Sequence, residues 1–236
     1  TTYPIHARNM VIGQCLDVGQ QSLIFFNQAD GRKIRWSREG YRKSETPELV
    51  DVKITDFCDY GCAFCYQDST EKGKDAPLSR IKEILTELVE NNVFEVAMGG
   101  GEPTKHKHFA EIMRFGADLG IVMNFTTYGL DWLKNKEIMD AILYANKKQG
   151  VGIGVSVHKA ADLKKASRII HEFSYAKRPF YGRRPQVTAQ TVMGILRNDS
   201  LLKMVDESFD QKVPLLLLGY KTTGRGDAFE MKWGKE

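Results

Sequence analysis

The sequence is poor in the features that mark secreted, fibrous or membrane-spanning proteins. Its 236 residues include four cysteines, five histidines and three tryptophans, and no low-complexity run. No apolar stretch comes near the roughly 20 residues that a membrane-spanning helix needs. Lysine and arginine exceed aspartate and glutamate by four charges, so charge gives no strong signal for nucleic acid. These absences leave an ordinary globular protein with no expected membrane contact.

The few cysteines are unevenly distributed. Cys58, Cys62 and Cys65 fall within eight positions, and Cys15 stands apart. A chain of this length buries enough apolar surface to fold without disulfide bonds. A clustered, odd number of thiols suits a reducing compartment better than a disulfide framework. We therefore expect free thiolates that bind a metal, in a cytoplasmic protein.

From residue 49 onward, short apolar runs alternate with amphipathic helical patterns. Strands are expected at 49–58, 93–103, 121–129, 151–159, 184–194 and 213–221. Helices are expected at 79–92, with Ser79 as N-cap, and at 108–120, 132–148, 160–173 and 199–209. Such alternation gives right-handed crossovers and a parallel sheet. Six units are too few for a closed eight-unit barrel, so we predict an α/β fold with an open, curved (β/α)6 sheet. A flat, doubly wound sheet is the alternative.

The two ends of the chain carry different patterns. Residues 10–27 and 32–37 read as short antiparallel strands, which makes 1–48 a β-hairpin extension packed on the core. The core is expected at 49–226 and a tail at 227–236. Because residues 222–236 are rich in glycine and charge, we expect a loop and a fraying end there.

The clustered cysteines follow the first core strand with the spacing Cys-x3-Cys-x2-Cys. Soft thiolates select iron–sulfur clusters, zinc or copper(I). Structural zinc usually uses two separated ligand pairs, and here a histidine from 106–108 would have to complete the site. A [4Fe–4S] cluster normally takes four cysteines, so three leave one iron open. Cys15 could close that site, or be a small buried apolar residue.

Two motifs resemble the radical S-adenosylmethionine (radical SAM) superfamily. Phe64 directly precedes Cys65, which matches the family signature Cys-x3-Cys-x-aromatic-Cys. The segment GGGEPT at 99–104 resembles the family's Gly-Gly-Glu-Pro motif, at the end of the second expected strand. The resemblance covers about 49–226 and implies a partial radical SAM barrel. It also implies a [4Fe–4S] cluster on the three clustered cysteines, with S-adenosylmethionine on the open iron.

The resemblance further implies which residues contact S-adenosylmethionine. The Gly-Gly-Glu-Pro edge would hold its amino group, two aromatic residues would flank the adenine, and polar strand ends would meet the ribose or a carboxylate. These residues are Gly100, Gly101, Glu102, Pro103, Phe64, Tyr66, Thr127, Ser156, Gln190 and Arg225. Tyr128 departs from the asparagine that relatives often have after that threonine. His158 stands where many relatives have aspartate, either facing the substrate or exposed at a strand end.

By resemblance, the protein is an enzyme that cleaves S-adenosylmethionine reductively to a 5′-deoxyadenosyl radical. The radical would abstract a hydrogen atom from a small molecule, a nucleotide or a peptide, and a flavodoxin- or ferredoxin-type protein would donate the electron. Since only Cys15 remains, we expect no auxiliary cluster, which argues against the cysteine-rich peptide maturases. The alternatives are an iron–sulfur electron carrier or sensor, and an S-adenosylmethionine-binding module without radical activity.

Overall fold

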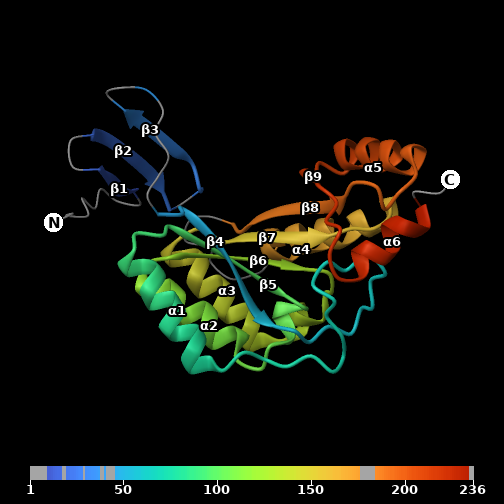
Figure 1. The fold of residues 1–236 in the computed structure, drawn as a ribbon, viewed down its shortest axis with the longest axis horizontal. Helices are drawn as coiled ribbons and strands as arrows, with labels where there is room; N and C mark the ends of the chain where they lie inside the picture. The colour runs from blue at the N-terminus through green and yellow to red at the C-terminus, as the bar shows by residue number, and fades with distance from the viewer. Residues whose placement is uncertain are drawn as a thin grey trace.

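The computed structural model describes residues 10–17, 20–28, 30–37, 40, 46–175 and 184–233. Its core is one six-stranded sheet in the order β4-β5-β6-β7-β8-β9, with every neighbouring pair parallel. The strands are β4 (Leu49–Thr55), β5 (Glu95–Gly100), β6 (Val122–Thr127), β7 (Gly152–Ser156), β8 (Gln186–Val192) and β9 (Leu215–Leu218). In Figure 1 the core arrows point toward the right, so the carboxyl ends of the strands meet at one edge.

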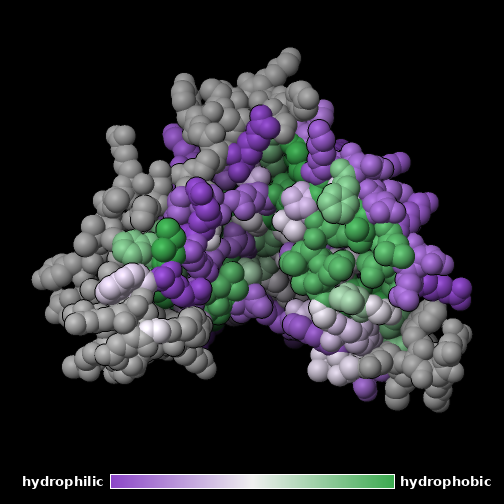
Figure 2. Space-filling view, turned by 90° about the horizontal axis from the view of Figure 1, so that it is seen from above, coloured by the Kyte–Doolittle hydropathy of each residue, from purple (hydrophilic) through white to green (hydrophobic). Residues whose placement is uncertain are grey.

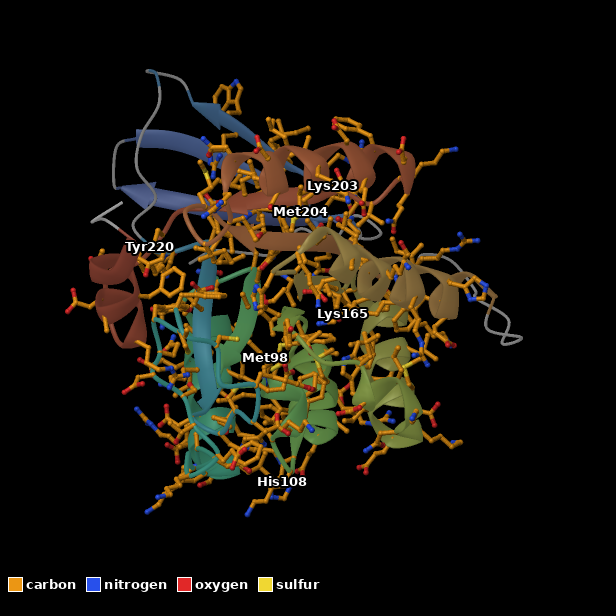
Figure 3. The ribbon with its side chains drawn as sticks, turned by 90° about the vertical axis from the view of Figure 1, so that its right-hand side faces the viewer. Met98, His108, Lys165, Lys203, Met204 and Tyr220 are labelled. Carbon is orange, nitrogen blue, oxygen red and sulfur yellow. The ribbon has the colours of Figure 1, made fainter. Side chains whose placement is uncertain are left out.

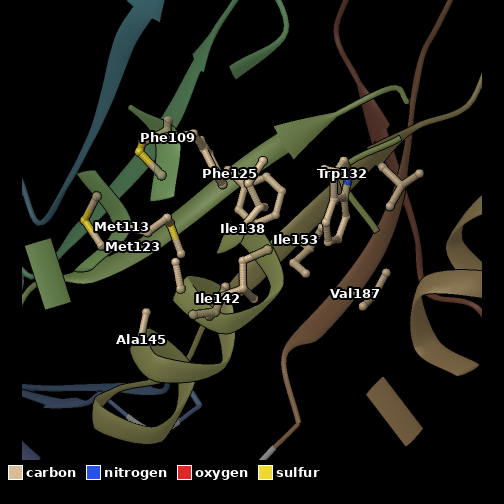
Figure 4. Close-up of a cluster of buried hydrophobic side chains, with 14 of the residues drawn as sticks. Phe109, Met113, Met123, Phe125, Trp132, Ile138, Ile142, Ala145, Ile153 and Val187 are labelled. Atoms are coloured by element: carbon tan, nitrogen blue, oxygen red, sulfur yellow. The ribbon is translucent and has the colours of Figure 1, made fainter. Parts of the chain in front are cut away.

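Helices connect the strands and cover one face of the sheet (Figure 1). They are α1 (Leu78–Glu90), α2 (Phe109–Leu119), α3 (Lys136–Lys148), α4 (Leu163–Tyr175) and α5 (Asn198–Asp210), with short 3-10 turns at Pro103–Lys105, Asp131–Lys134 and Ala160–Asp162. The core lies between this face and the helices. Phe125, Ile153 and Val187 of the strands pack there with Trp132 and Ile142 (Figure 4). The residues that alternate with these along each strand therefore point to the other face of the sheet, away from the helices.

The predicted alternation of strands and helices and the open parallel sheet are confirmed. Helix α2 ends as expected at Gly120, whose φ of 89° is the left-handed conformation that glycine adopts readily. Ser79 is not the N-cap of α1: the helix begins one residue earlier, after Pro77, whose ring fixes a φ of −59°.

The expected tail contains a helix instead. Helix α6 (Arg225–Trp233) begins within the glycine-rich loop after β9. The expectation of a loop and fraying end over 222–236 was therefore wrong for residues 225–233, and 234–236 lie outside the described residues. The tail expected at 227–236 was inferred from its composition. Its residues 227–233 instead belong to α6, and the first residue of that helix contacts the cysteine loop.

The N-terminal segment forms a separate antiparallel sheet, β1 (Met10–Asp17), β2 (Gln20–Asn27) and β3 (Lys33–Ser37). Figure 1 places it at the left, at the amino end of the core strands. Phe26 stacks on Phe94 with ring centroids 5.0 Å apart, and Lys33 pairs with Glu95 at 2.9 Å. The expected antiparallel extension is thus present, against the edge opposite to the cysteine loop; the first nine residues and Cys15's side chain lie outside what the structure describes. Among the described residues, no helix is long and apolar enough to cross a membrane.

Candidate active site

The three clustered cysteines lie in the loop that joins β4 to α1, at the carboxyl edge of the sheet. Figure 3 looks onto this edge. Backbone bonds fix both ends of the loop: Cys58 N–H donates to the carbonyl of Thr70 at 2.9 Å, and Ala76 N–H donates to Ile54 at 2.9 Å. The hydroxyl of Thr55 donates to Asp75 at 2.8 Å. The loop that carries the thiols is therefore anchored rather than free.

All three thiols are free and half-buried. Burial raises the pKa of the Cys58 thiol, and the neighbouring Glu102 and Cys65 raise it further. Burial likewise raises the pKa of Cys62, with Cys58 and Cys65 adding to the effect. Cys58 and Cys62 therefore each lie near other thiols of the loop, and the positive charge of a bound metal would offset the repulsion between their thiolates. Three soft donors on one anchored loop at an open edge fit an iron–sulfur cluster with an incomplete protein ligand set.

Helix α6 braces the cysteine loop from the far end of the chain. The Arg225 backbone N–H donates to the carbonyl of Cys65 at 3.0 Å, and its guanidinium Nε donates to the carbonyl of Cys62 at 3.0 Å. The two remaining guanidinium nitrogens donate to Asp68 and to the carbonyl of Ser69, both at 2.9 Å. The resemblance implied that Arg225 meets a carboxylate of the cofactor or substrate. In the structure its guanidinium binds the cysteine loop.

The Gly-Gly-Glu-Pro edge lies directly against the chain that leads into Cys58. A Cβ atom on Gly100 would come within 2.2 Å of the carbonyl oxygen of Thr55, and one on Gly101 within 1.9 Å of that of Phe57. This closeness allows Gly101 N–H to donate to Thr55 at 2.7 Å and the next N–H to Phe57 at 2.8 Å. Only residues without a side chain permit two backbones to approach this far. The two sequence motifs of the site are therefore joined backbone to backbone.

Glu102 is buried, with 2% of its surface exposed, and its carboxylate is surrounded by donors. Thr104 and Thr127 donate their hydroxyls to one carboxylate oxygen at 2.6 and 2.8 Å, and Tyr128 donates its backbone N–H to the other at 2.9 Å. Burial raises the pKa of Glu102 even though these hydrogen bonds oppose the shift. The carboxylate ties the end of β5 to the end of β6.

Aromatic side chains from separate elements form a wall beside the thiols. The imidazole of His158 stacks on Tyr128, with centroids 4.8 Å apart, and meets the edge of Phe64 at 4.8 Å. Tyr60 meets the edge of Tyr128 at 4.8 Å, and Lys165 Nζ lies 3.4 Å from the centroid of that same tyrosine ring. Figure 3 shows Lys165 near the middle of this edge. Tyr128, which stands where relatives often have asparagine, is thus the centre of the stack.

His158 is also the neighbour of a cysteine. Its Nε2 lies 3.7 Å from the sulfur of Cys62, and burial lowers its pKa, while the charge of Asp162 opposes that change. His158 is half-buried, so the expectation of an exposed strand end was wrong, whereas the substrate-facing role stays a prediction. Lys165 and Asp162 were missed by sequence reasoning, because both lie at the start of an ordinary amphipathic helix; no local motif marks them.

The other expected contacts are spread around the edge. Tyr66 is 45% exposed, beneath Lys221 Nζ at 4.2 Å, so it lies outside the stack that contains Phe64. Ser156 ends β7 and is paired in register with Gln190 of β8. Pro103 begins the turn after Glu102 and is buried. Phe64 therefore lies in the aromatic stack with His158, which contacts Cys62, whereas Tyr66 lies outside that stack.

The histidines considered as zinc ligands are engaged elsewhere. His106 Nε2 lies 3.1 Å from the carbonyl of Ala76, and its Nδ1 accepts the backbone N–H of His108 at 3.0 Å. His108 itself lies beside Glu111 at 3.5 Å. In the part of the chain that the structure describes, no three His, Cys, Asp or Glu side chains are placed to hold a single metal ion.

A partial parallel α/β barrel that carries three thiols on one loop and a glycine edge at its carboxyl end defines a class of cofactor-dependent enzymes. The comparison with protein families names it: the family model described as the Radical SAM superfamily matches residues 52–178. The chain belongs to the radical SAM superfamily.

Curated relatives share part of their length with this chain. The PqqA peptide cyclase of Bradyrhizobium diazoefficiens is 28% identical over 129 residues, which are 50% of this chain and 34% of that protein. An S-adenosylmethionine-dependent nucleotide dehydratase of Selenomonas ruminantium is 30% identical over 107 residues, 45% of this chain and 38% of that protein. The matched region is thus little more than a third of these relatives.

A solved structure shares the fold. Streptococcus suis SuiB bound to S-adenosylmethionine has a TM-score of 0.65 and 12% identity, and the match covers 91% of this chain and 63% of that chain. The curated relatives also include the mycofactocin maturase MftC of Mycolicibacterium smegmatis, 28% identical over 90 residues, which are 38% of this chain and 23% of that protein. The cysteine count argued against the cysteine-rich peptide maturases. The expectation that no auxiliary cluster exists concerns these 236 residues and stays a prediction.

Proposed function

We propose that Cys58, Cys62 and Cys65 hold a [4Fe–4S] cluster whose open iron binds S-adenosylmethionine for reductive cleavage. The observation that carries this proposal is the junction of the cysteine loop with the glycine edge, where Gly101 N–H bonds to Thr55 at 2.7 Å. When bound, such a cluster supplies the electron that splits S-adenosylmethionine into methionine and a 5′-deoxyadenosyl radical.

The protein's own residues would position the cofactors. Because the buried carboxylate of Glu102 already accepts four hydrogen bonds from side-chain and backbone donors, we assign it to holding the edge in shape, together with Thr127. The amino group of S-adenosylmethionine would then meet backbone carbonyls of the edge. A Cβ on Gly99 would meet no atom within 4 Å, so the chain is open to a ligand there. Ser156 and Gln190 remain proposed contacts for the carboxylate or the ribose.

The face of the sheet away from the helices is the proposed substrate surface. On β7, a Cβ at Gly154 would lie 2.5 Å from Gln190 Nε2 and 2.9 Å from Thr126 Oγ1, so an amide and a hydroxyl converge across that glycine. Ile153 and Val155 on either side point into the core instead. Because the PqqA peptide cyclase is among the relatives, we favour a peptide as substrate over a nucleotide or another small molecule. The Thr126 hydroxyl at that position suits the backbone of a peptide, beside the Gln190 amide that we assign to S-adenosylmethionine.

The electron would come from a flavodoxin- or ferredoxin-type protein. The half-buried thiols and the cluster they would hold suit the reducing cytoplasm, which we propose as the compartment.

The test is anaerobic cleavage. The chain would be reconstituted with iron and sulfide, reduced with dithionite and incubated with S-adenosylmethionine, and 5′-deoxyadenosine would be measured by chromatography. We expect product from the wild type and from Cys15→Ala, and none from Cys62→Ala. A cluster that forms but gives no product, with or without peptide, would favour the electron carrier. Product from Cys15→Ala but none from the wild type would mean that the fourth cysteine closes the site.

A further inference from the structure

The imidazole of His158 is held in one orientation beside a cluster ligand. Its ring is stacked on Tyr128 at an interplanar angle of 15° and meets Phe64 at 87°, so two rings restrict its rotation. Its backbone N–H donates to Asp162 at 3.1 Å, which fixes the end of β7. In this orientation Nε2 faces the sulfur of Cys62 at 3.7 Å, within the range of a hydrogen bond to sulfur.

The two ring nitrogens differ in their surroundings. Nδ1 is buried and has no hydrogen-bond partner, whereas Nε2 faces the sulfur. A cysteine that ligates iron is a thiolate, which accepts hydrogen bonds and cannot donate one. Contact with such a sulfur therefore favours the tautomer that carries its proton on Nε2, because that proton then has an acceptor and Nδ1 is left as a bare lone pair.

We propose that His158 donates an Nε2–H···S hydrogen bond to the Cys62 thiolate and so raises the reduction potential of the bound cluster. The inference rests on the proposed function, since it requires the cluster. One-electron reduction adds negative charge to the cluster and its sulfur ligands, so a donor aimed at a sulfur stabilises the reduced form more than the oxidised form. His158 is a positioning residue here: it acts on the cluster through Cys62 and contacts no reacting carbon.

Neighbouring groups do not replace this contact. Arg225 donates to the backbone carbonyl of Cys62, not to its sulfur. Lys165 lies over the ring of Tyr128 and pairs with Asp162 at 3.6 Å. Among the described side chains, His158 is the one that lies within hydrogen-bond distance of a cysteine sulfur of the loop.

The experiment is a redox titration of the reconstituted full chain, followed by electron paramagnetic resonance without S-adenosylmethionine. His158→Phe keeps an aromatic ring for the stack but removes the donor, and His158→Gln places an amide N–H near the position of Nε2. The matched control is His108→Phe. This is the same substitution at the histidine that precedes α2, which lies outside the aromatic wall. Iron and sulfide per chain are measured for each variant.

We expect His158→Phe to shift the midpoint potential to lower values, His158→Gln to restore most of the shift, and His108→Phe to leave it unchanged. A fully loaded His158→Phe chain with the wild-type potential would overturn the inference while leaving the proposed function intact. A wild type that takes up no cluster would contradict both.

A second readout covers the case in which His158→Phe fails to fold or to load. In wild-type chain grown with ¹⁵N-labelled histidine, the reduced cluster should show a hyperfine coupling to one histidine nitrogen, and this coupling should be absent in His158→Gln. Absence of any histidine coupling in the loaded wild type would refute the hydrogen bond directly.

Discussion

Replacing Gly101 by alanine should separate the two halves of the site, because no space exists for a side chain there. The new Cβ would lie 1.9 Å from the carbonyl oxygen of Phe57, whereas ordinary contact begins near 3.4 Å, so the backbones must part by about 1.5 Å. That movement breaks the hydrogen bonds of 2.7 and 2.8 Å that join this edge to Thr55 and Phe57. Two lost backbone bonds and the overpacking together cost roughly 2–4 kcal/mol.

The matched control is Gly99→Ala, two residues earlier in the same motif. A Cβ at Gly99 meets nothing within 4 Å, so its stability should change by less than about 1 kcal/mol. Urea unfolding of the two metal-free variants measures the difference. Because Phe57 adjoins Cys58, Gly101→Ala should also take up less iron and sulfide on reconstitution. Equal urea midpoints for the two variants would refute the argument that close backbone approach explains these glycines.

Three further outcomes follow from the contacts of single side chains. Arg225→Met removes the guanidinium hydrogen bonds to the loop carbonyls, so the metal-free thiols should be alkylated faster at fixed pH. The control is Arg80→Met, at an exposed arginine that pairs with Glu83. Equal alkylation rates in the two variants would show that α6 does not brace the loop. Burial raises the pKa of Glu102 above the ordinary 4.5, so the protonated carboxyl contributes stability below pH 4.5 that is lost as the pH rises through the raised pKa. The wild type should therefore lose unfolding free energy relative to Glu102→Gln over that range, and a difference that stays constant with pH contradicts the shift. Phe26→Ala empties a fully buried position against Phe94 and should lower the unfolding free energy by about 3–5 kcal/mol, against little change for the exposed Ile34→Ala on the other face.

The alternation of strands and helices could be predicted because its signal is local. Each core strand carries apolar residues on the face that meets the helices, as Ile153 and Val155 do around Gly154 in β7. The order of the strands then follows from the right-handed crossover rule. The start of α1 was misplaced by one residue because serine is a common N-cap, whereas Pro77 precedes this helix and no side chain caps it.

Helix α6 could not be predicted because its position depends on contacts made far away in the sequence. The segment begins in a glycine-rich loop and is only weakly amphipathic, so its sequence pattern indicates a tail. Its first residue, Arg225, donates to the carbonyls of Cys62 and Cys65, more than 150 positions earlier. A local sequence pattern cannot indicate a contact with residues so distant in the chain.

The cysteine loop and the glycine edge could be located from the sequence, whereas the side chains around them could not. The structure joins the two segments that carry these motifs by backbone hydrogen bonds. The aromatic stack of Tyr128, His158 and Phe64, in contrast, combines three separate elements. Tyr128 was visible only as a departure from the family pattern. Its ring contacts, and the cation of Lys165 above it, needed the fold.

An apolar surface of the chain has no assigned role. Exposed apolar side chains gather over α5 and β9, where Leu202, Phe209, Leu216 and Leu217 are 62%, 77%, 45% and 41% exposed, and Figure 2 shows apolar residues massed on that side.

The central claim is that three cysteines hold a cluster with an iron left open for S-adenosylmethionine. The most direct test is electron paramagnetic resonance of the reduced, reconstituted chain before and after S-adenosylmethionine is added, with iron and sulfide counted per chain. We predict about four irons per chain and a reduced-cluster signal whose shape changes on addition of S-adenosylmethionine. A fully loaded chain whose signal S-adenosylmethionine leaves unchanged would contradict the claim.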